Sequence, residues 1–428
     1  MIASKMKKGG NVMKDVIEKQ INNTISNEVK LSGLIKIKVE KDSQFLVGYG
    51  LVQKIIAIKK PDIVIDGSNA VIVVEGGENV NSNIALFYIY NEAKNVQFKN
   101  IKIYVNLNNL ENTTKTFYAV YNNASCIKLD NCSLEVTCKN QMNLTGIYNN
   151  GLIDTSMSKN AENMNISNCL INMKCCATTF TKECNVYGIY NHLSNSISVQ
   201  NSVIYATNAG TGENQKAIGI YTNGRFGRFI GNNIKANSSH SRGKEKEQGH
   251  SLGIHNQGLY SIITSNNIVS EWAGAAIGVE NQGEYAKISS NKILSTHTIC
   301  GRCIRSHAGR SILDGNVLTT TSRNARLIEN HGAESIITNN YLECFMPIEN
   351  CVTGCGIYSV GYNSKDLIIK NNIIKNIKDC GIFTEGSSGI VADNIFTSHN
   401  SKFTSYGETT NQKLKKQLDE KNIYSIYS

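Results

Sequence analysis

This 428-residue chain contains six side chains that are suited to acid–base chemistry and regularly spaced. Four of them follow one another at intervals of 24 or 25 residues, and each of the other two stands two residues after one of these positions. They are His255, Glu280, Arg305, His307, Glu329 and His331. Carboxylates and imidazoles move protons, and a guanidinium holds an anion. If one interval equals one turn of a repeating structure, all six lie in one patch.

Two reactions fit these groups. Glu280 and Glu329, two rungs apart on parallel strands, would be anchored roughly 10 Å from each other. With side-chain reach, that is near the roughly 6.5–9.5 Å separation of inverting glycosidases. Arg305 between them lowers the pKa of both carboxyls and opposes a protonated acid. The other reaction is β-elimination from a uronate sugar, in which Arg305 neutralises the substrate carboxylate and neutral His307 or His331 removes the adjacent proton.

Further residues that the same alignment places in or beside the patch complete the predicted substrate site. Tyr221 or Tyr358 would be the proton donor. The predicted substrate-binding residues are Tyr221, His255, Trp272, Arg302, Arg326 and Tyr358, with the arginines in or near the bordering turns. Structural alternatives stay open, because a tyrosine stack can be a packing ladder and a Glu–Arg–Glu row can be a surface ion-pair ladder of little stability.

The spacing comes from a repeat. Segments of the type Gly-Ile-Tyr-Asn-x-Gly begin at Gly146, Gly188, Gly219, Gly253, Gly278, Gly356 and Gly381. Each is followed by a short apolar run, an asparagine and a second apolar run. Periods of 20–50 residues indicate stacked units. The runs alternate with period 2 and leave no room for a helix between strands, so each strand pairs with its copy in the next coil and a parallel solenoid results.

Two columns fix the alignment. One contains the asparagines, which we expect in turns with left-handed backbone and with their amides bonded in a ladder. Its members are Asn100, Asn131, Asn168, Asn201, Asn232, Asn266, Asn291, Asn316, Asn340, Asn372 and Asn394. The other column holds mainly aromatic residues and is interrupted by the charged residues and His255. Its aromatic members are Tyr90, Tyr121, Tyr148, Tyr190, Tyr221, Tyr358 and Phe383.

These repeats resemble the right-handed parallel β-helix of the pectin-lyase-like superfamily over about Leu31–Ser398. The resemblance implies an all-β, single-stranded right-handed parallel β-helix of about eleven or more coils with short helical caps. We expect an N-terminal tail and capping helix in residues 1–30, the β-helix in 31–400 and a C-terminal cap in 401–428. Because many members of the superfamily cleave or bind acidic polysaccharides, the resemblance implies an acidic saccharide or another small anionic substrate.

The outer columns lack the aspartate cluster that holds calcium in pectate-lyase-like members and the Asp-Asp-His arrangement of polygalacturonase-like members. We therefore expect no metal and no cofactor; calcium held by Glu280 and Glu329 is the weaker alternative. Cys300 and Cys303 have the spacing of a redox or zinc half-site, but no second pair follows at suitable spacing, which favours ordinary thiols.

Composition limits the partners. A formal net charge of +10 favours an acidic substrate, while the spread of the basic residues argues against nucleic acid. No apolar run reaches the length of a membrane span, so we expect no membrane contact. The N-terminus lacks an apolar run of the secretory type, and the 13 cysteines are scattered, so we expect a cytoplasmic protein that is a monomer or a homo-oligomer.

The insertions between repeats all precede a Gly-Ile strand and should border one binding groove. They are Leu107–Thr116, Cys175–Tyr187, Thr207–Ala217, Asn237–His250, Glu271–Ala275, Thr296–Arg302 and Glu343–Cys355. The sequence thus favours an acid–base enzyme, a lyase acting in this groove. Alternatives are an inverting glycoside hydrolase, an intracellular isomerase or cyclase on the same face, and a non-catalytic carbohydrate-binding tailspike-like module or structural solenoid.

Overall fold

The computed structural model of the protein describes residues 10–39, 52–76, 82–109, 115–151, 161–177, 184–209, 215–238, 249–271, 274–296, 299–346, 350–360, 365–385, 388–397, 404–406 and 412–425. It contains two compact units, Met1–Glu213 and Asn214–Ser428. The candidate site lies entirely in the second unit.

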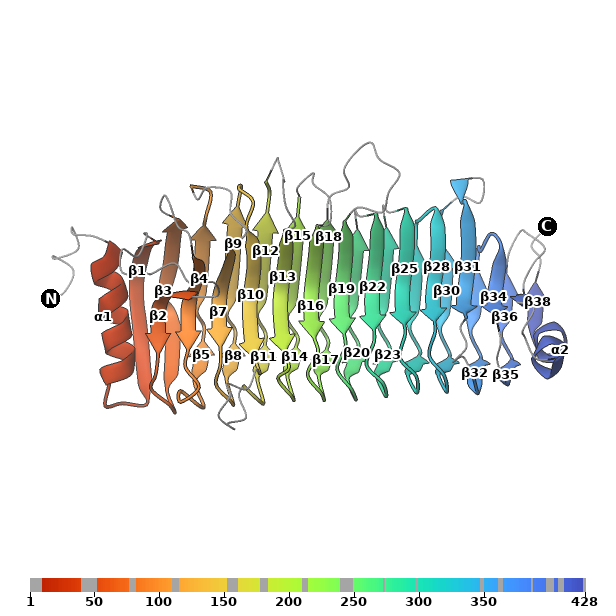
Figure 1. Ribbon diagram of the computed structural model, residues 1–428, viewed down its shortest axis with the longest axis horizontal. Helices are drawn as coiled ribbons and strands as arrows, with labels where there is room; N and C mark the ends of the chain where they lie inside the picture. Colours follow the sequence, from red (N-terminus) through yellow and green to blue (C-terminus); the bar gives the residue numbers. More distant parts are fainter. Residues whose placement is uncertain are drawn as a thin grey trace. The chain divides into compact units, whose positions relative to one another are not determined.

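The first unit begins with a helix and continues as parallel strands (Figure 1). Its elements are α1 (Gly10–Asn23), β1 (Glu28–Val39), β2 (Val52–Ile58), β3 (Val64–Gly76), β4 (Asn83–Ile89), β5 (Gln97–Lys99), β6 (Lys102–Asn106), β7 (Thr116–Asn122), β8 (Lys128–Asp130), β9 (Ser133–Cys138), β10 (Asn143–Asn150), β11 (Asn165–Ser167), β12 (Leu170–Cys175), β13 (Asn185–His192), β14 (Ser198–Gln200) and β15 (Val203–Asn208).

The second unit repeats the same pattern of one long and two short strands per coil. Its elements are β16 (Lys216–Thr222), β17 (Arg228–Ile230), β18 (Asn233–Ser238), β19 (His250–Asn256), β20 (Ile262–Thr264), β21 (Asn267–Glu271), β22 (Ala275–Asn281), β23 (Lys287–Ser289), β24 (Lys292–Thr296), β25 (Cys300–Ser306), β26 (Ile312–Asp314), β27 (Val317–Thr320), β28 (Asn324–Asn330), β29 (Ile336–Thr338), β30 (Tyr341–Cys344), β31 (Thr353–Ser359), β32 (Leu367–Lys370), β33 (Ile373–Lys375), β34 (Cys380–Thr384), β35 (Gly389–Ala392), β36 (Ile395–Thr397), β37 (Thr404–Tyr406), α2 (Gln412–Glu420) and β38 (Ile423–Ser425).

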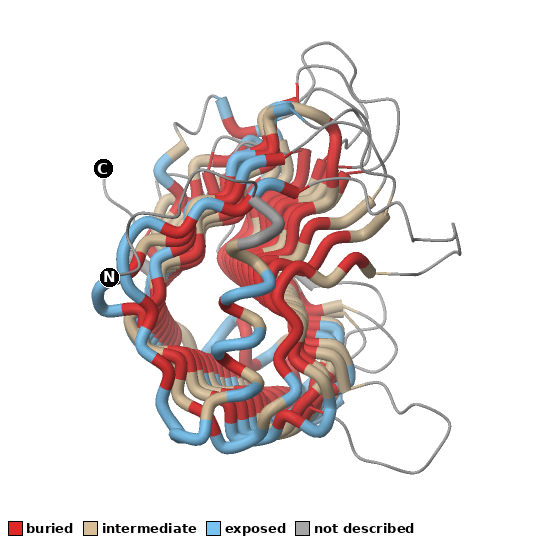
Figure 2. Tube along the Cα trace, turned by 90° about the vertical axis from the view of Figure 1, so that its left-hand side faces the viewer, coloured by how far each residue is buried: buried red, intermediate tan, exposed pale blue. Residues whose placement is uncertain are grey.

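Each strand pairs in parallel with the equivalent strand of the next coil, so the fold is a parallel β-helix, the solenoid that the repeats predict. In the second unit the long strands β16, β19, β22, β25, β28, β31, β34 and β37 form one wall, which we call the Gly-Ile wall. The short strands form the other side, where β20 pairs with β23 and β21 with β24. Figure 2 shows buried residues along the strands and exposed residues mostly in the turns.

Close approach of neighbouring coils explains the glycines of the repeat. A Cβ on Gly278 would lie 2.1 Å from Cγ2 of Ile293 inside the coil and 2.6 Å from the carbonyl oxygen of Cys303 on the next strand. A Cβ on Gly258, in the following turn, would lie 1.8 Å from the carbonyl oxygen of Gly224. At these two positions a larger side chain would push the coils apart, so each glycine is a steric requirement there.

The asparagine column is more varied than the repeat predicts. In the first unit Asn100, Asn131, Asn168 and Asn201 have the expected left-handed backbone. In the second unit the asparagines occupy the next, buried position, and residues such as Ser265 and Ser290 take the left-handed one. There the ladder is continuous: Asn266 donates from Nδ2 to Oδ1 of Asn291 at 3.0 Å and to the carbonyl of Phe229 at 2.9 Å. In the second unit, the residues with left-handed backbone are therefore not the residues whose side-chain amides form the continuous ladder.

The start of the aromatic column also needs a correction. Tyr88, not Tyr90, is the register partner of Tyr121. The two-residue difference preserves the face, because side chains alternate along a strand. Tyr90 instead follows β4, where its hydroxyl accepts a hydrogen bond from Lys54 Nζ at 2.8 Å.

Short helices lie at both ends of the strand series. Helix α1 buries Ile17 and Ile21, and its Asn22 bonds the main chain of β2 by donating to the Ala57 carbonyl at 2.8 Å. Helix α2 buries Leu414 and Leu418, and the side-chain oxygen of Gln417 accepts from the Val391 amide at 2.9 Å. These contacts bond strand edges that would otherwise be open.

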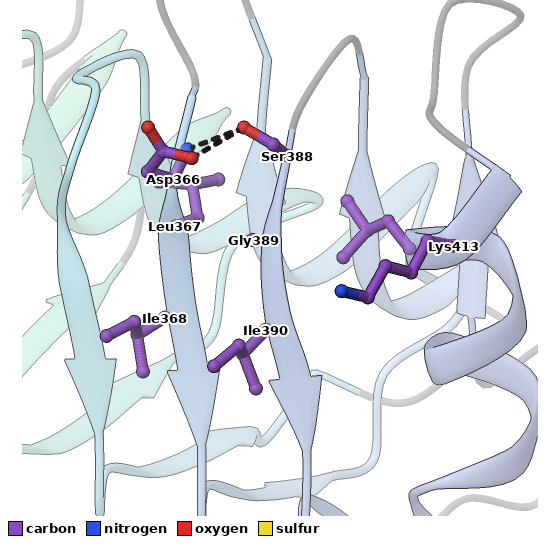
Figure 3. Close-up of a pocket in the computed structure, with 8 residues that line it drawn as sticks. Asp366, Leu367, Ile368, Ser388, Gly389, Ile390 and Lys413 are labelled. Atoms are coloured by element: carbon purple, nitrogen blue, oxygen red, sulfur yellow. Dashed lines mark hydrogen bonds between the residues drawn. The ribbon is translucent and has the colours of Figure 1, made fainter.

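A hollow of about 390 Å³ lies between α2 and the strands β32 and β35 (Figure 3). Ile368 and Ile390 line it from adjacent strands, and the Ser388 hydroxyl donates to Asp366 Oδ1 at 2.7 Å at one edge. Because it is lined by the short strands, it is separate from the groove predicted beside the Gly-Ile strands.

Candidate functional site

The predicted patch forms on the Gly-Ile wall of the second unit. Six residues are successive register partners on adjacent strands, one from each of β16, β19, β22, β25, β28 and β31, which lie side by side in Figure 1. In order they are Tyr221, His255, Glu280, Arg305, Glu329 and Tyr358. Buried residues flank them in each strand, such as Ile304 and Ser306 beside Arg305, so these side chains face outward.

Glu329 is the most buried charged residue of the patch, at 3% exposure. Its Oε1 lies 3.0 Å from Nε2 of His331 and 3.4 Å from Nη1 of Arg326, and its Oε2 accepts from Nε of Arg302. Burial alone would raise the pKa of the carboxyl, but the hydrogen bond with His331 and the arginine charges lower it to about 2. Glu329 is therefore ionised and holds the surrounding cations in place.

Glu280 has a looser environment. Its Oε2 lies 3.9 Å from Nε2 of His255, and its Oε1 lies 3.8 Å from Nε2 of His307 and 3.7 Å from Nη1 of Arg305. These separations exceed hydrogen-bond length. The Glu280 side chain is 12% exposed, so small movements would let it orient either imidazole.

The surroundings of His307 and His255 favour the neutral form of each imidazole. Burial, Arg305 and His331 lower the pKa of His307, against the smaller effects of the glutamates. Burial also lowers the pKa of His255, and Glu280 opposes this. The rings of His307 and His331 stack with centroids 5.0 Å apart and 7° between their planes. The His307 side chain is 35% exposed, so it can reach a bound molecule.

Arg305 lies between the two carboxylates. Its Nε is 3.8 Å from Oε1 of Glu329 and has no hydrogen-bond partner among the residues that the structure describes. The three arginines Arg302, Arg305 and Arg326 face two glutamates, so the patch carries one net positive charge when its histidines are neutral. This electrostatic balance suits an anionic ligand.

The positions of Arg302 and Arg326 differ from the sequence prediction, which put them in or near the turns bordering the patch. They are register partners inside β25 and β28, because these strands begin before the aligned Gly-Ile positions. Both lie three residues before the column of Arg305 and Glu329. The Cζ atom of Arg326 lies 3.9 Å from the centroid of the Tyr358 ring, so the arginine rests on that ring.

Tyr221 and Tyr358 mark the two ends of the patch. The Tyr221 hydroxyl donates to Oε1 of Gln257 at 2.7 Å, and its ring meets His255 edge-on at 5.1 Å. Tyr358 instead stacks on Phe383 at 5.0 Å. Tyr358 is one coil from Glu329, whereas Tyr221 is two coils from Glu280, so the structure puts Tyr358 nearer to the stacked histidines.

Several predicted features lie outside the described residues. Trp272 is one of them, and so are the central parts of the predicted insertions. Cys300 and Cys303 are described and diverge: Cys303 is fully buried and bonds the Thr319 carbonyl at 3.1 Å, while Cys300 is half-exposed at the strand edge. They do not form a half-site.

A calcium site at Glu280 and Glu329 does not fit these residues. The guanidinium of Arg305 lies between the carboxylates, 3.7 and 3.8 Å from their oxygens, and would repel a cation. Across the described parts of the chain, no group of three or more histidine, cysteine, aspartate or glutamate side chains could hold a metal ion.

The tyrosines of the first unit form a packed ladder. Ring centroids lie 5.1 Å apart for Tyr88 and Tyr121, 4.8 Å for Tyr121 and Tyr148, and 5.3 Å for Tyr148 and Tyr190. Burial raises the pKa of Tyr121 and of Tyr148. Because each ring covers its neighbour, the ladder offers few free ring faces, and it fits the packing alternative.

Sequence reasoning missed one feature of this face. Phe226, Tyr260 and Tyr285 form an exposed stacked row in the turn that follows the patch. The signal was present, since each aromatic residue follows the first glycine of its repeat by seven positions, as Tyr260 follows Gly253.

In the ranges given above, no helix is long and apolar enough to cross a membrane.

No protein-family model matches the chain, and no curated protein matches its sequence. Solved structures match its fold. A mutant tailspike protein of E. coli bacteriophage HK620 in complex with pentasaccharide aligns with TM-score 0.54 and 10% identity over 95% of this chain and 76% of that chain. A second mutant of that tailspike with pentasaccharide gives TM-score 0.50 and 11% identity over 94% and 76%. The mannuronan C-5 epimerase A-module of Azotobacter vinelandii gives TM-score 0.47 and 8% identity over 94% and 91%.

Proposed function

We propose that this right-handed parallel β-helix acts on an acidic, uronate-type saccharide by general acid–base chemistry on the outer side of its Gly-Ile wall, most directly by β-elimination. The observation that carries the proposal is His307, a partly exposed imidazole whose pKa is lowered by burial and by Arg305. A neutral imidazole beside a guanidinium combines a base with a carboxylate clamp.

In the proposed reaction Arg305 and Arg326 hold the carboxylate of the reacting sugar. His307 takes the proton on the carbon next to that carboxylate, and the electron pair forms a double bond to the neighbouring carbon. The glycosidic oxygen leaves that carbon and takes a proton from Tyr358. Glu329 holds Arg326 and His331 in position, and the His331 ring supports the base by stacking on His307.

Hydrolysis by two carboxylates has less support. An inverting glycosidase needs one protonated carboxyl as its acid, but the pKa of Glu329 is lowered to about 2. That carboxyl cannot donate a proton near neutral pH. Delivery of a proton to the opposite face of the same carbon would make the protein an isomerase, which uses the same base and clamp together with a proton donor on the other side of the sugar.

Saccharide binding without turnover is the second candidate. It is supported by the likeness to a tailspike solved with a pentasaccharide and by the ion pairs that already engage Glu329. The net charge of +10 favours an acidic glycan in both cases.

The test is an absorbance assay for unsaturated uronate ends with polygalacturonate, alginate and hyaluronan as substrates. We expect one of them to yield such ends, and His307→Ala to reduce the rate at least a hundredfold, the lower range for a general base. The matched control is His192→Ala, since His192 stands at the end of β13 in the first unit, two residues after its column tyrosine. Binding without new ends would refute elimination and favour the second candidate.

A further inference from the structure

A stacked aromatic row lies on the turn that borders the patch. The residues Phe226, Tyr260 and Tyr285, which we call the aromatic strip, are 51%, 45% and 40% exposed. Their neighbouring ring centroids are 5.5 and 4.8 Å apart, with 14° and 12° between the planes. The strip ends at Arg310, whose Nη1 donates to the Tyr285 hydroxyl at 2.7 Å.

The backbone of this turn is unfavourable for aromatic residues. Phe226, Tyr260 and Tyr285 have φ values of 61°, 58° and 59°, in the left-handed region that bulky residues rarely occupy. At the same turn in the first unit the chain uses small side chains, such as Asn163 and Ser196. Stacking offsets part of this cost, but the outer ring edges remain in water. Strain of this kind that folding does not require points to a function.

A second column changes residue type together with the strip. Three residues before each aromatic ring stands an amide, Asn223, Gln257 or Gln282. Gln257 donates from Nε2 to Oε1 of Gln282 at 2.9 Å. In the next two coils both positions change at once, to His307 with Arg310 and to His331 with Glu334. The face therefore has two zones: an amide–aromatic zone over three coils and a charged zone over two.

We propose that the amide–aromatic zone binds the sugar units that flank the reacting unit of a longer saccharide chain. This inference rests on the proposed function, because it takes the charged zone as the place where the reacting unit sits. The apolar ring edges would contact the C–H surface of the sugars, and the amides would bond their hydroxyls.

The charges at the border agree with this division. Arg310 is paired with Glu334 at 3.0 Å and lies 3.9 Å from Glu284, so its charge is already balanced. The two arginines proposed to bind the carboxylate, Arg305 and Arg326, lie in the charged zone. A chain lying across successive coils would therefore meet its clamp at Arg305 and its contacts with neutral groups at Gln282, Tyr285, Gln257 and Tyr260.

Tyr260→Asn tests the proposal without threatening the fold, because asparagine tolerates the left-handed backbone. The control is Phe345→Ser, which removes another exposed aromatic residue, 57% exposed and outside the strip. The measurement is the dissociation constant of graded oligosaccharides, from dimers to octamers, of polygalacturonate, alginate and hyaluronan. Thermal unfolding of each variant checks that the fold is retained.

We expect Tyr260→Asn to weaken binding of the longer oligosaccharides on the order of tenfold and to leave the shortest binding oligosaccharide and the stability nearly unchanged. Phe345→Ser should change neither. Equal affinity of the parent and Tyr260→Asn at every oligosaccharide length would overturn the proposal, and so would an equal loss of affinity at every length. Absence of binding to all three oligosaccharide series, or binding of a protein segment instead of a saccharide, would also overturn it. Length-dependent loss without any turnover would retain the strip as a saccharide site and refute the proposed reaction alone.

Discussion

Removing the charge of Glu329 should destabilise the protein strongly, and the structure gives the size of the effect. The pKa of this carboxyl falls from an ordinary 4.5 to about 2 on folding. Each unit of pKa shift corresponds to about 1.4 kcal/mol, so the ionised carboxylate contributes about 3 kcal/mol to the free energy of unfolding. Removing one partner of a buried ion pair costs about 3–5 kcal/mol in proteins generally. We therefore expect Glu329→Gln to lower the free energy of unfolding by about 3 kcal/mol at pH 7.

The pH dependence follows from the direction of the shift. Because the folded-state pKa lies below the unfolded-state value, the contribution of Glu329 is fully present above about pH 4.5. It is lost as the pH falls from about 4.5 toward 2. The difference between the parent and Glu329→Gln should therefore be largest near neutral pH and shrink across this window.

The assay is urea unfolding of both proteins at pH 7, 4.5 and 2.5, followed by circular dichroism. Glu334→Gln is the matched control, because Glu334 pairs with Arg310 but is half-exposed; surface pairs of this kind are worth about 0–1 kcal/mol. A loss below about 1 kcal/mol for Glu329→Gln at pH 7, or a difference that does not change with pH, would refute the reasoning.

Three other outcomes are expected. Gly278→Ala should destabilise the fold by about 1–3 kcal/mol or more, since its Cβ would lie 2.1 Å from Ile293; a thermal scan checks this, and unchanged stability would contradict the close approach of the coils. Asn291→Ala should cost about 1–3 kcal/mol by leaving ladder partners unsatisfied, including the Asn316 and Ile263 oxygens, while Asn267→Ala on the exposed face should cost far less by urea unfolding. As the pH falls, turnover should be lost with an inflection below pH 6.5, because the pKa of His307 is lowered from its ordinary value and the imidazole stays neutral above that point. The measurement is the pH–rate profile, and an inflection above pH 7 would exclude His307 as the base.

The fold was predictable because the repeat has a steric cause. Glycines such as Gly278 are fixed by backbone contact between coils, so their spacing gives the register that places Glu280 beside Arg305. The alternation of apolar residues then gives the outward face. These constraints recur along the chain at the spacing of the repeat, so they can be seen in the sequence without knowing any contact.

The burial and bonding of the patch were less predictable. Register puts Glu329 next to Arg305, but its main partners are His331 and the arginines at the earlier strand position, Arg302 and Arg326. Which carboxylate becomes buried depends on side-chain packing across three strands. Nothing in the sequence distinguishes Glu280 from Glu329. In the structure Glu329 is buried and closely paired, whereas the partners of Glu280 lie beyond hydrogen-bond length.

The asparagines show the same limit. A single column was expected to combine left-handed backbone with an amide ladder. In the second unit the buried ladder residue, for example Asn266, follows the left-handed Ser265 by one position. Spacing in the sequence cannot resolve a shift of one residue between coils whose turns differ, so the two roles were merged. The aromatic strip was overlooked although its residues share one position of the repeat, because turn residues lie outside the alternating apolar runs from which the strands were predicted.

The most direct measurement is a crystal structure of the protein soaked with an acidic oligosaccharide that it binds. Density for a sugar carboxylate against Arg305 and Arg326, with His307 beside the adjacent carbon, is the result that we predict. Density on the short-strand side or in the hollow beside α2, with the Gly-Ile wall unchanged, would contradict the account.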